Sequence, residues 1–343
     1  MPLAPLTTLR LGGEAAYFLA AHTIADVQGA VAWAQNKGVP LLVLGGGSNV
    51  VMPDAGWDGL VLHMQLRGQN VSNEGALIHV VAAAGEPWDA FVQSATRNKW
   101  AGVECLAGIP GLVGSTPIQN VGAYGQDVSE TIARVRVLER ATGALHWLTK
   151  DELQFSYRDS VLRRELSRFI VVEVAFDLRA GGAPSVRYAE LQHALAATAN
   201  PTLLDVRAQV LALRRKKSMV LDAADPNSQS VGSFFTNPLV DVQMAAEVAR
   251  IASASGLAHV PQWPQPDGRV KLAAGWLIEN AGFSRGLRRG AVGLSSAHAL
   301  ALVHFGGGTS NELLALARQV RDGVKAKFGV TLQPEPILIG ASL

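Results

Sequence analysis

The segment from Gly108 to Gly125, GIPGLVGSTPIQNVGAYG, constrains the fold of this chain more than any other. It holds too many glycines and prolines for a helix interior, where glycine costs about 1 kcal/mol and proline about 3 kcal/mol. It is also too apolar for a solvated linker. We therefore expect an ordered, buried, irregular loop whose backbone polar groups need partners. A large ligand with many hydrogen-bonding groups would supply them; a loop packed for its own sake is the alternative.

Composition limits the class of protein. A chain of 343 residues predicts two or three domains, and a net charge of +2 with 17% charged residues gives no basic stripe for nucleic acid. The single cysteine, Cys105, excludes an internal disulfide framework and a cysteine metal cluster, and we expect it to be a small buried hydrophobe. The N-terminus has no signal-peptide pattern and no long apolar span follows. We expect a soluble cytoplasmic protein without a metal site.

Helix and strand signals alternate along the chain. Thr23 and Asp26 predict a capping box for a helix that runs to Gly38, and VPLLVL (39 to 44) predicts the strand that follows. Further expected elements are strands at 133 to 139 and 169 to 178, a helix from about 203 that ends in the cations RRKK (214 to 217), and a helix that begins at Thr309 and Glu312. The glycines before Thr309 are thus explained as a helix start and receive no function.

A first glycine-rich loop follows the strand at 39 to 44. It consists of Gly45, Gly46, Gly47, Ser48 and Asn49. Missing β-carbons let consecutive backbone amides approach an anion, so a diphosphate could bind here, although a simple turn is the alternative. The dinucleotide fingerprint G-x-G-x-x-G fails, because valine occupies the third glycine position and no helix-forming run follows.

The loop at 108 to 125 offers donors of several kinds. Gly114, Ser115 and Thr116 can donate to phosphate, while Gln119, Asn120 and Tyr124 can hydrogen-bond or stack.

Three further residues are candidates for chemistry. Ser233 lies in SVGSFFTNP (230 to 238) with no adjoining histidine, cysteine or acid, so a proton donor or ligand contact is indicated rather than a Ser-His-Asp nucleophile. Arg158 in YRDS has an ion pair with its neighbour Asp159 as the simpler interpretation. Glu335 lies between Pro334 and Pro336, which stiffen the backbone on both sides of its carboxyl group.

Taken together, these segments resemble the UDP-N-acetylenolpyruvoylglucosamine reductases, over nearly the whole chain and in the family's order. The resemblance implies an α+β fold with a two-part FAD-binding region of the vanillyl-alcohol oxidase/p-cresol methylhydroxylase type, at 1–65 and 66–217, and a C-terminal α+β substrate-binding domain at 218–343. It also implies the long (type I) form, because Tyr188 matches the tyrosine that this form places over substrate. The segments are LGGGSNV (44 to 50), IPGLVGSTPIQNVGAYG (109 to 125), YRDS (157 to 160), GSFFTNP (232 to 238), KLAAGWLI (271 to 278) and PEP (334 to 336).

The resemblance also implies a reaction. NADPH reduces FAD, which then reduces UDP-N-acetylglucosamine enolpyruvate to UDP-N-acetylmuramate for peptidoglycan. The family's catalytic groups fall on Arg158, Ser233 and Glu335. Arg158 and a protonated Glu335 would stabilise the enolate, and Ser233 would be the general acid. Because neither glycine-rich loop contains histidine or cysteine, we expect noncovalent FAD.

Binding residues follow from the same resemblance. Two departures affect them: Trp263 stands where many members have tyrosine, and RRKK leaves open whether Lys216 or Lys217 faces the ligand. The expected FAD contacts are Gly45, Gly46, Gly47, Ser48, Asn49, Ile109, Gly114, Ser115, Thr116, Gln119, Asn120, Gly122 and Ala123. The expected substrate contacts are Tyr124, Tyr188, Lys217, Asn237 and Trp263.

Three alternatives remain open at this point. They are a flavin oxidase of the same FAD fold, a flavin or nucleotide-sugar binding protein that has lost catalysis, and a structural helper of cell-wall synthesis. The presence of Arg158, Ser233 and Glu335 argues against the second. We expect a monomer that binds no nucleic acid and does not insert into a membrane.

Overall fold

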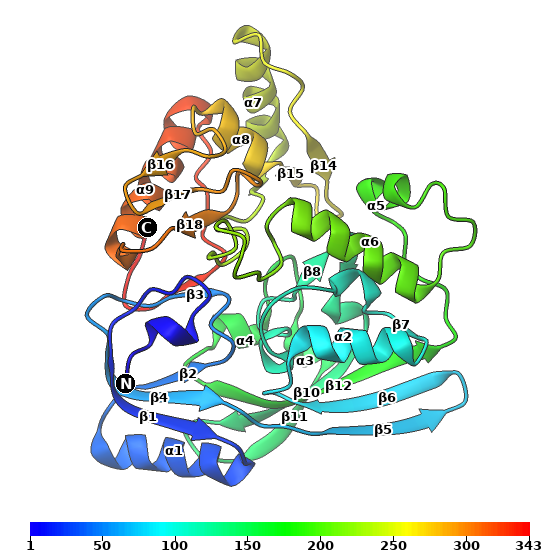
Figure 1. The fold of residues 1–343 in the computed structure, drawn as a ribbon, viewed down its shortest axis with the longest axis vertical. Helices are drawn as coiled ribbons and strands as arrows, with labels where there is room; N and C mark the ends of the chain where they lie inside the picture. The colour runs from blue at the N-terminus through cyan, green and yellow to red at the C-terminus, as the bar shows by residue number, and fades with distance from the viewer. The chain divides into compact units, whose positions relative to one another are not determined.

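The chain divides into two compact units in the computed structural model, which describes residues 1–343. Unit 1 contains Met1, 15–47 and 57–220, and unit 2 contains 2–14, 48–56 and 221–343 (Figure 1). The break at 220/221 is close to the boundary expected at 217/218. Two short N-terminal segments belong to unit 2 because they pair there: β3 (Val50–Val51) is parallel to β19 (Ile337–Leu338), and the Gly13 amide donates to the Pro53 carbonyl at 2.9 Å.

A small parallel sheet opens unit 1. Its strands are ordered β1 (Ala15–Ala21), β4 (Trp57–Met64) and β2 (Leu41–Leu44). Helix α1 (Ile24–Lys37) connects β1 to β2 and has the predicted capping box of Thr23 and Asp26. It ends at Gly38 in the left-handed conformation, with φ of 66°. The predicted helix and strand are therefore both confirmed.

A larger sheet forms the rest of the framework of unit 1. Its antiparallel order is β11 (Leu145–Thr149), β10 (Ile132–Glu139), β12 (Phe169–Ala180), β6 (Leu77–Ala83) and β5 (Gln69–Glu74), and β7 (Trp100–Ala101) also pairs with β12. The strands predicted at 133 to 139 and 169 to 178 are β10 and β12. The other elements of unit 1 are α2 (Trp88–Arg97), α3 (Lys150–Leu153), α4 (Val161–Arg164), α5 (Ala189–Ala194), α6 (Leu203–Lys216), β8 (Gly122–Ala123), β9 (Gln126–Asp127) and the short 3-10 helices Glu104–Leu106, Val113–Ser115 and Val128–Glu130.

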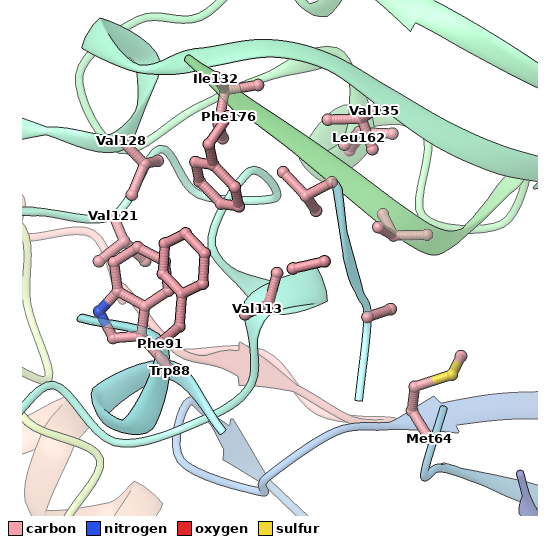
Figure 2. Packing of buried hydrophobic residues seen from close by; sticks show 14 of the residues in the cluster. Met64, Trp88, Phe91, Val113, Val121, Val128, Ile132, Val135, Leu162 and Phe176 are labelled. Carbon is pink, nitrogen blue, oxygen red and sulfur yellow. The ribbon is translucent and has the colours of Figure 1, made fainter. Parts of the chain in front are cut away.

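Aromatic side chains form the centre of the unit 1 core (Figure 2). Trp88 and Phe91 project from α2, and their ring centroids are 5.4 Å apart. Phe91 packs against Phe176 of β12 at 4.7 Å, and all three side chains are buried. Burying such side chains contributes about 1.5–3 kcal/mol each. This packing fixes α2 against the sheet and, with it, the loop segments that α2 supports.

Unit 2 has its own hydrophobic core around a long amphipathic helix. Helix α9 (Ser310–Phe328) begins with the predicted capping box of Thr309 and Glu312, and its apolar face includes Leu313, Val320 and Phe328. One three-stranded sheet has the order β13 (Leu239–Val240), β15 (Val270–Leu272), β14 (Gln262–Pro264), and another the order β16 (Arg288–Arg289), β17 (Val292–Leu294), β18 (Leu302–His304). Helices α7 (Val242–Ala254) and α8 (Ala274–Asn280) and the 3-10 helix Ala4–Leu6 complete the unit.

None of the helices combines the length and apolar character needed to cross a bilayer.

Candidate active site

The loop from Gly108 to Gly125 is held by the chain just before and inside the first turn of α2. The amide of Gly114 donates to the carbonyl of Ala84 at 2.9 Å, and the amide of Val113 donates to the carbonyl of Glu86 at 2.8 Å. The backbone amide of Trp88 donates a hydrogen bond to the Gly111 carbonyl at 3.1 Å. The expected ordered, irregular loop is confirmed. Its backbone bonds to a segment anchored in the aromatic core give it a fixed shape, in which the 3-10 turn Val113–Ser115 and the two-residue strand β8 are the regular elements.

The glycines after β2 pack directly against this loop within unit 1. A β-carbon on Gly46 would lie 2.9 Å from the Cα of Gly111, and one on Gly45 would lie 3.3 Å from the Ser115 Oγ. Glycine at position 46 therefore permits the close approach of the two loops. The amides of Gly45 and Gly46 donate no hydrogen bond within the chain. Unpaired backbone donors beside a second glycine-rich loop are suited to a phosphate-bearing ligand.

Two of the side chains expected to contact FAD also hold the loop in shape. The Thr116 hydroxyl donates to the Val113 carbonyl at 2.8 Å. The side-chain nitrogen of Asn120 donates to the Ser156 carbonyl at 2.9 Å, and its side-chain oxygen accepts from the backbone amide of Ser129 at 3.2 Å. The backbone of Asn120 is left-handed, with φ of 45°. These bonds explain why threonine and asparagine suit those positions, independently of any ligand.

Arg158 lies against the same loop. Its guanidinium donates to the carbonyls of Gly122 at 2.5 Å and Asn120 at 3.3 Å, and it lies 3.7 Å from an Asp127 oxygen. Its neighbour Asp159 pairs with Arg164. The bonds to the loop fix the orientation of the planar guanidinium beside Gly122.

A cluster of Tyr124, Tyr188, Lys217 and Glu190 lies at the end of the loop. The tyrosine rings meet edge to face with centroids 5.6 Å apart, and the Lys217 ammonium lies 5.5 Å from the centre of the Tyr124 ring. Lys217 Nζ donates to Glu190 Oε2 at 2.5 Å. Burial raises the pKa of Tyr124 to about 12, so its phenol stays protonated and can donate at neutral pH.

The structure distinguishes the two lysines of RRKK. Lys216 is exposed, whereas Lys217 is half-buried and reaches the tyrosines. Sequence reasoning missed Glu190, because no local pattern links α5 to the end of α6. It also gave no separate role to Arg214, whose Nη2 donates to the Met219 carbonyl at 2.7 Å and whose Nε is buried without a partner. Burial lowers the pKa of Arg214 to about 10, so the side chain remains charged at neutral pH.

Unit 2 brings Ser233 and Glu335 onto neighbouring backbone segments. The Glu335 amide donates to the carbonyl of Phe234 at 2.9 Å, and Phe235 forms an antiparallel bridge with Pro334. Phe234 and Phe235 are buried in the core of this unit. The buried phenylalanines therefore hold the backbone of Ser233 next to that of Glu335, although the two residues are far apart in sequence. The Ser233 side chain is half-buried.

The other expected residues of unit 2 have different surroundings. The Asn237 side-chain oxygen accepts from the amide of Ala274, the first residue of α8, at 2.9 Å. The Asn49 amide donates to the Glu335 carbonyl at 3.4 Å. Trp263, on β14, is 45% exposed, and the Lys271 ammonium lies 5.8 Å from its ring. A large exposed aromatic face of this kind can stack on a planar ligand.

Comparison with known proteins gives a consistent result over the full length. Residues 225–339 match the family model described as UDP-N-acetylenolpyruvoylglucosamine reductase, C-terminal domain, and residues 15–149 match an FAD binding domain. The chain is 48% identical to the UDP-N-acetylenolpyruvoylglucosamine reductase of Saccharopolyspora erythraea, over 99% of this chain and 95% of the relative. It is 45% identical to that of Thermobifida fusca, over 100% and 98%.

A solved structure agrees with the fold. The UDP-N-acetylenolpyruvylglucosamine reductase of Thermus caldophilus superposes with a TM-score of 0.67 at 24% identity, covering 98% of this chain and 97% of that one. The local geometry also suits FAD. The unpaired amides of Gly45 and Gly46 and the donors of the adjoining loop fit a diphosphate-bearing cofactor. The chain therefore belongs to the UDP-N-acetylenolpyruvoylglucosamine reductase family and is an FAD-binding oxidoreductase.

Proposed function

We propose that this protein reduces UDP-N-acetylglucosamine enolpyruvate to UDP-N-acetylmuramate, as a cytoplasmic monomer that uses NADPH in peptidoglycan synthesis. Sequence identities of 48% and 45%, over nearly the full length, to two UDP-N-acetylenolpyruvoylglucosamine reductases support the proposal. The structural observation that carries it is the backbone pairing that sets Ser233 beside Glu335, since this reaction needs a proton donor next to a group that stabilises an enolate.

FAD would be held by the loops at 45–49 and 108–125, and it would supply hydride taken from NADPH to the methylene carbon of the enolpyruvyl group. The electron pair of the carbon–carbon double bond then moves toward the carboxylate, which gains enolate character. Arg158 binds that carboxylate with the fork of its guanidinium, whose orientation is set by the carbonyls of Gly122 and Asn120. The charge of Arg158 therefore stabilises the electron-rich state more than the substrate.

Glu335 and Ser233 complete the reaction. Protonated Glu335 donates a hydrogen bond to the developing enolate, because an ionised carboxylate would repel it. Ser233 transfers its proton to the carbon next to the carboxylate and regains one from solvent. An alcohol is acidic enough for this transfer because the enolate is strongly basic.

The substrate contacts proposed for the nucleotide sugar are Tyr124, Tyr188 and Lys217 in unit 1 and Asn237 and Trp263 in unit 2. The half-buried ammonium of Lys217 is suited to the diphosphate, and the exposed ring of Trp263 is suited to stacking. The amide nitrogen of Asn237 can face ligand because only its oxygen is used at α8.

The test of this function is oxidation of NADPH by the purified yellow protein without oxygen. We expect sustained oxidation only when UDP-N-acetylglucosamine enolpyruvate is present, with UDP-N-acetylmuramate as the product by mass spectrometry. A single reduction of the flavin that stalls despite the substrate would overturn the proposal and direct the search to oxidase substrates in air.

Glu335→Gln is expected to lower kcat by about tenfold, which corresponds to about 1.4 kcal/mol, near the net value of one hydrogen bond. The loss is moderate because the glutamine amide can still donate to the enolate. Steady-state kinetics at saturating substrate measure it, and the flavin reduction rate with NADPH serves as the control. We expect Ser233→Ala to lower kcat more than this, so a greater loss for Glu335→Gln than for Ser233→Ala would contradict the prediction.

A further inference from the structure

Lys217 has a counter-ion in the ligand-free protein. Its ammonium donates to Glu190 Oε2 at 2.5 Å, and both side chains are about one third exposed, at 31% and 38%. Glu190 belongs to the first turn of α5, two residues after Tyr188, whereas Lys217 follows the last residue of α6. The pair therefore joins two elements that each contribute to the tyrosine cluster.

The local charges make this pair informative. Lys217 and Arg214 are cations near Tyr124. Glu190 is a carboxylate near the same residue, and its charge raises the pKa of the Tyr124 phenol. A diphosphate carries two negative charges and would compete with the Glu190 carboxylate for the Lys217 ammonium. The Lys217 ammonium, however, has donors besides the one bound to Glu190. An exposed pair of this kind contributes at most about 1 kcal/mol, so a diphosphate can replace the carboxylate at small cost.

We propose that Glu190 is a displaceable counter-ion of Lys217, which holds the ammonium beside Tyr124 until a diphosphate takes its place. This inference rests on the proposed role of Lys217 in binding substrate. Glu190 thereby lowers the affinity of the site for diphosphates and disfavours weaker anions that cannot compete with a carboxylate. It is a positioning residue, since it acts through Lys217 and takes no part in hydride or proton transfer.

The experiment measures the affinity of the FAD-loaded protein for UDP by isothermal titration calorimetry. Glu190→Gln is expected to tighten UDP binding by about threefold to fivefold at low ionic strength, and by less at high ionic strength, because salt weakens the ion pair that competes for Lys217. Lys217→Gln is expected to weaken binding. In the Lys217→Gln background, the further change Glu190→Gln should have little effect on UDP affinity, which identifies coupling between the two residues.

Glu165→Gln is the matched control. Glu165 pairs with Arg168 at 2.9 Å and its side chain is 40% exposed, close to the value for Glu190, but it does not contact the tyrosine cluster. The control should leave UDP affinity unchanged. Thermal unfolding of each variant separates a loss of folding from a change in binding.

The outcomes separate this inference from the assignments on which it rests. Suppose that Lys217→Gln weakens UDP binding, whereas Glu190→Gln leaves it unchanged or weakens it. The hypothesis that Glu190 is a displaceable counter-ion is then wrong, while the substrate role of Lys217 stands. If Lys217→Gln has no effect, the role of Lys217 fails and the inference fails with it. The predicted pattern with UDP, in a protein that does not turn over the enolpyruvyl substrate, would support the inference and refute the proposed reaction.

Discussion

Ser233→Ala is expected to reduce turnover of the enolpyruvyl substrate by about 10²–10⁴-fold, the usual contribution of a positioned general acid. Reduction of the flavin by NADPH should proceed at the normal rate, because that step does not need the proton of Ser233. The backbone that places this serine beside Glu335 depends on the buried Phe234 and Phe235, which the substitution leaves intact. The loss should therefore appear in kcat without loss of stability.

Rapid-mixing kinetics separate the two half-reactions of this variant. Flavin reduction by NADPH and reoxidation by the substrate are followed by absorbance without oxygen. Ser233→Cys provides the matched comparison, since a thiol retains an exchangeable proton and should recover part of the rate. Reoxidation of Ser233→Ala at a near-normal rate would refute the proton-donor role, as would equal rates for the alanine and cysteine variants.

Arg158→Lys is expected to lower kcat/KM by about 10²–10³-fold, although the positive charge is kept. The guanidinium is oriented by the carbonyls of Gly122 and Asn120, and an ammonium cannot bind these groups and a carboxylate with the same planar fork. The backbone of Arg158 is left-handed, with φ of 56°. Lysine and arginine pay a similar conformational cost there, so the change mainly tests the head group.

The control for Arg158→Lys is Arg164→Lys, which alters the exposed partner of Asp159 at the end of helix α4. That variant should stay within a few-fold of the parent in kcat/KM. For Arg158→Lys, a rise in KM with unchanged kcat would show that the guanidinium only binds substrate and does not stabilise the transition state.

Local signals in the sequence predicted the elements with the clearest boundaries. The capping pairs Thr23 with Asp26 and Thr309 with Glu312 correctly marked the starts of α1 and α9. They succeed because each box is a set of contacts among four successive residues. The run at 169 to 178 likewise predicted β12, which extends two residues further, to Ala180.

Long-range contacts account for what the sequence did not reveal. The pairing of Lys217 with Glu190 crosses from α6 to α5, and the position of Glu335 beside Ser233 depends on a bridge between distant segments. No period or spacing encodes such contacts. Arg158 was given Asp159 as its simplest partner because they are adjacent, yet Asp159 pairs with Arg164. The candidate catalytic residues were found by resemblance, and their contacts only from the structure.

The parallel pairing of β3 with β19 has a consequence for how the protein is made. Residues 48–56 leave the ribosome long before their strand partner at Ile337–Leu338 is synthesised. Unit 2 therefore cannot complete this pairing until Ile337 and Leu338 have been added, and such distant pairings slow folding. Glu335 takes its place in the same late step. A chain that stopped before Glu335 would leave strand β3 without its partner and would lack the carboxyl group proposed to stabilise the enolate.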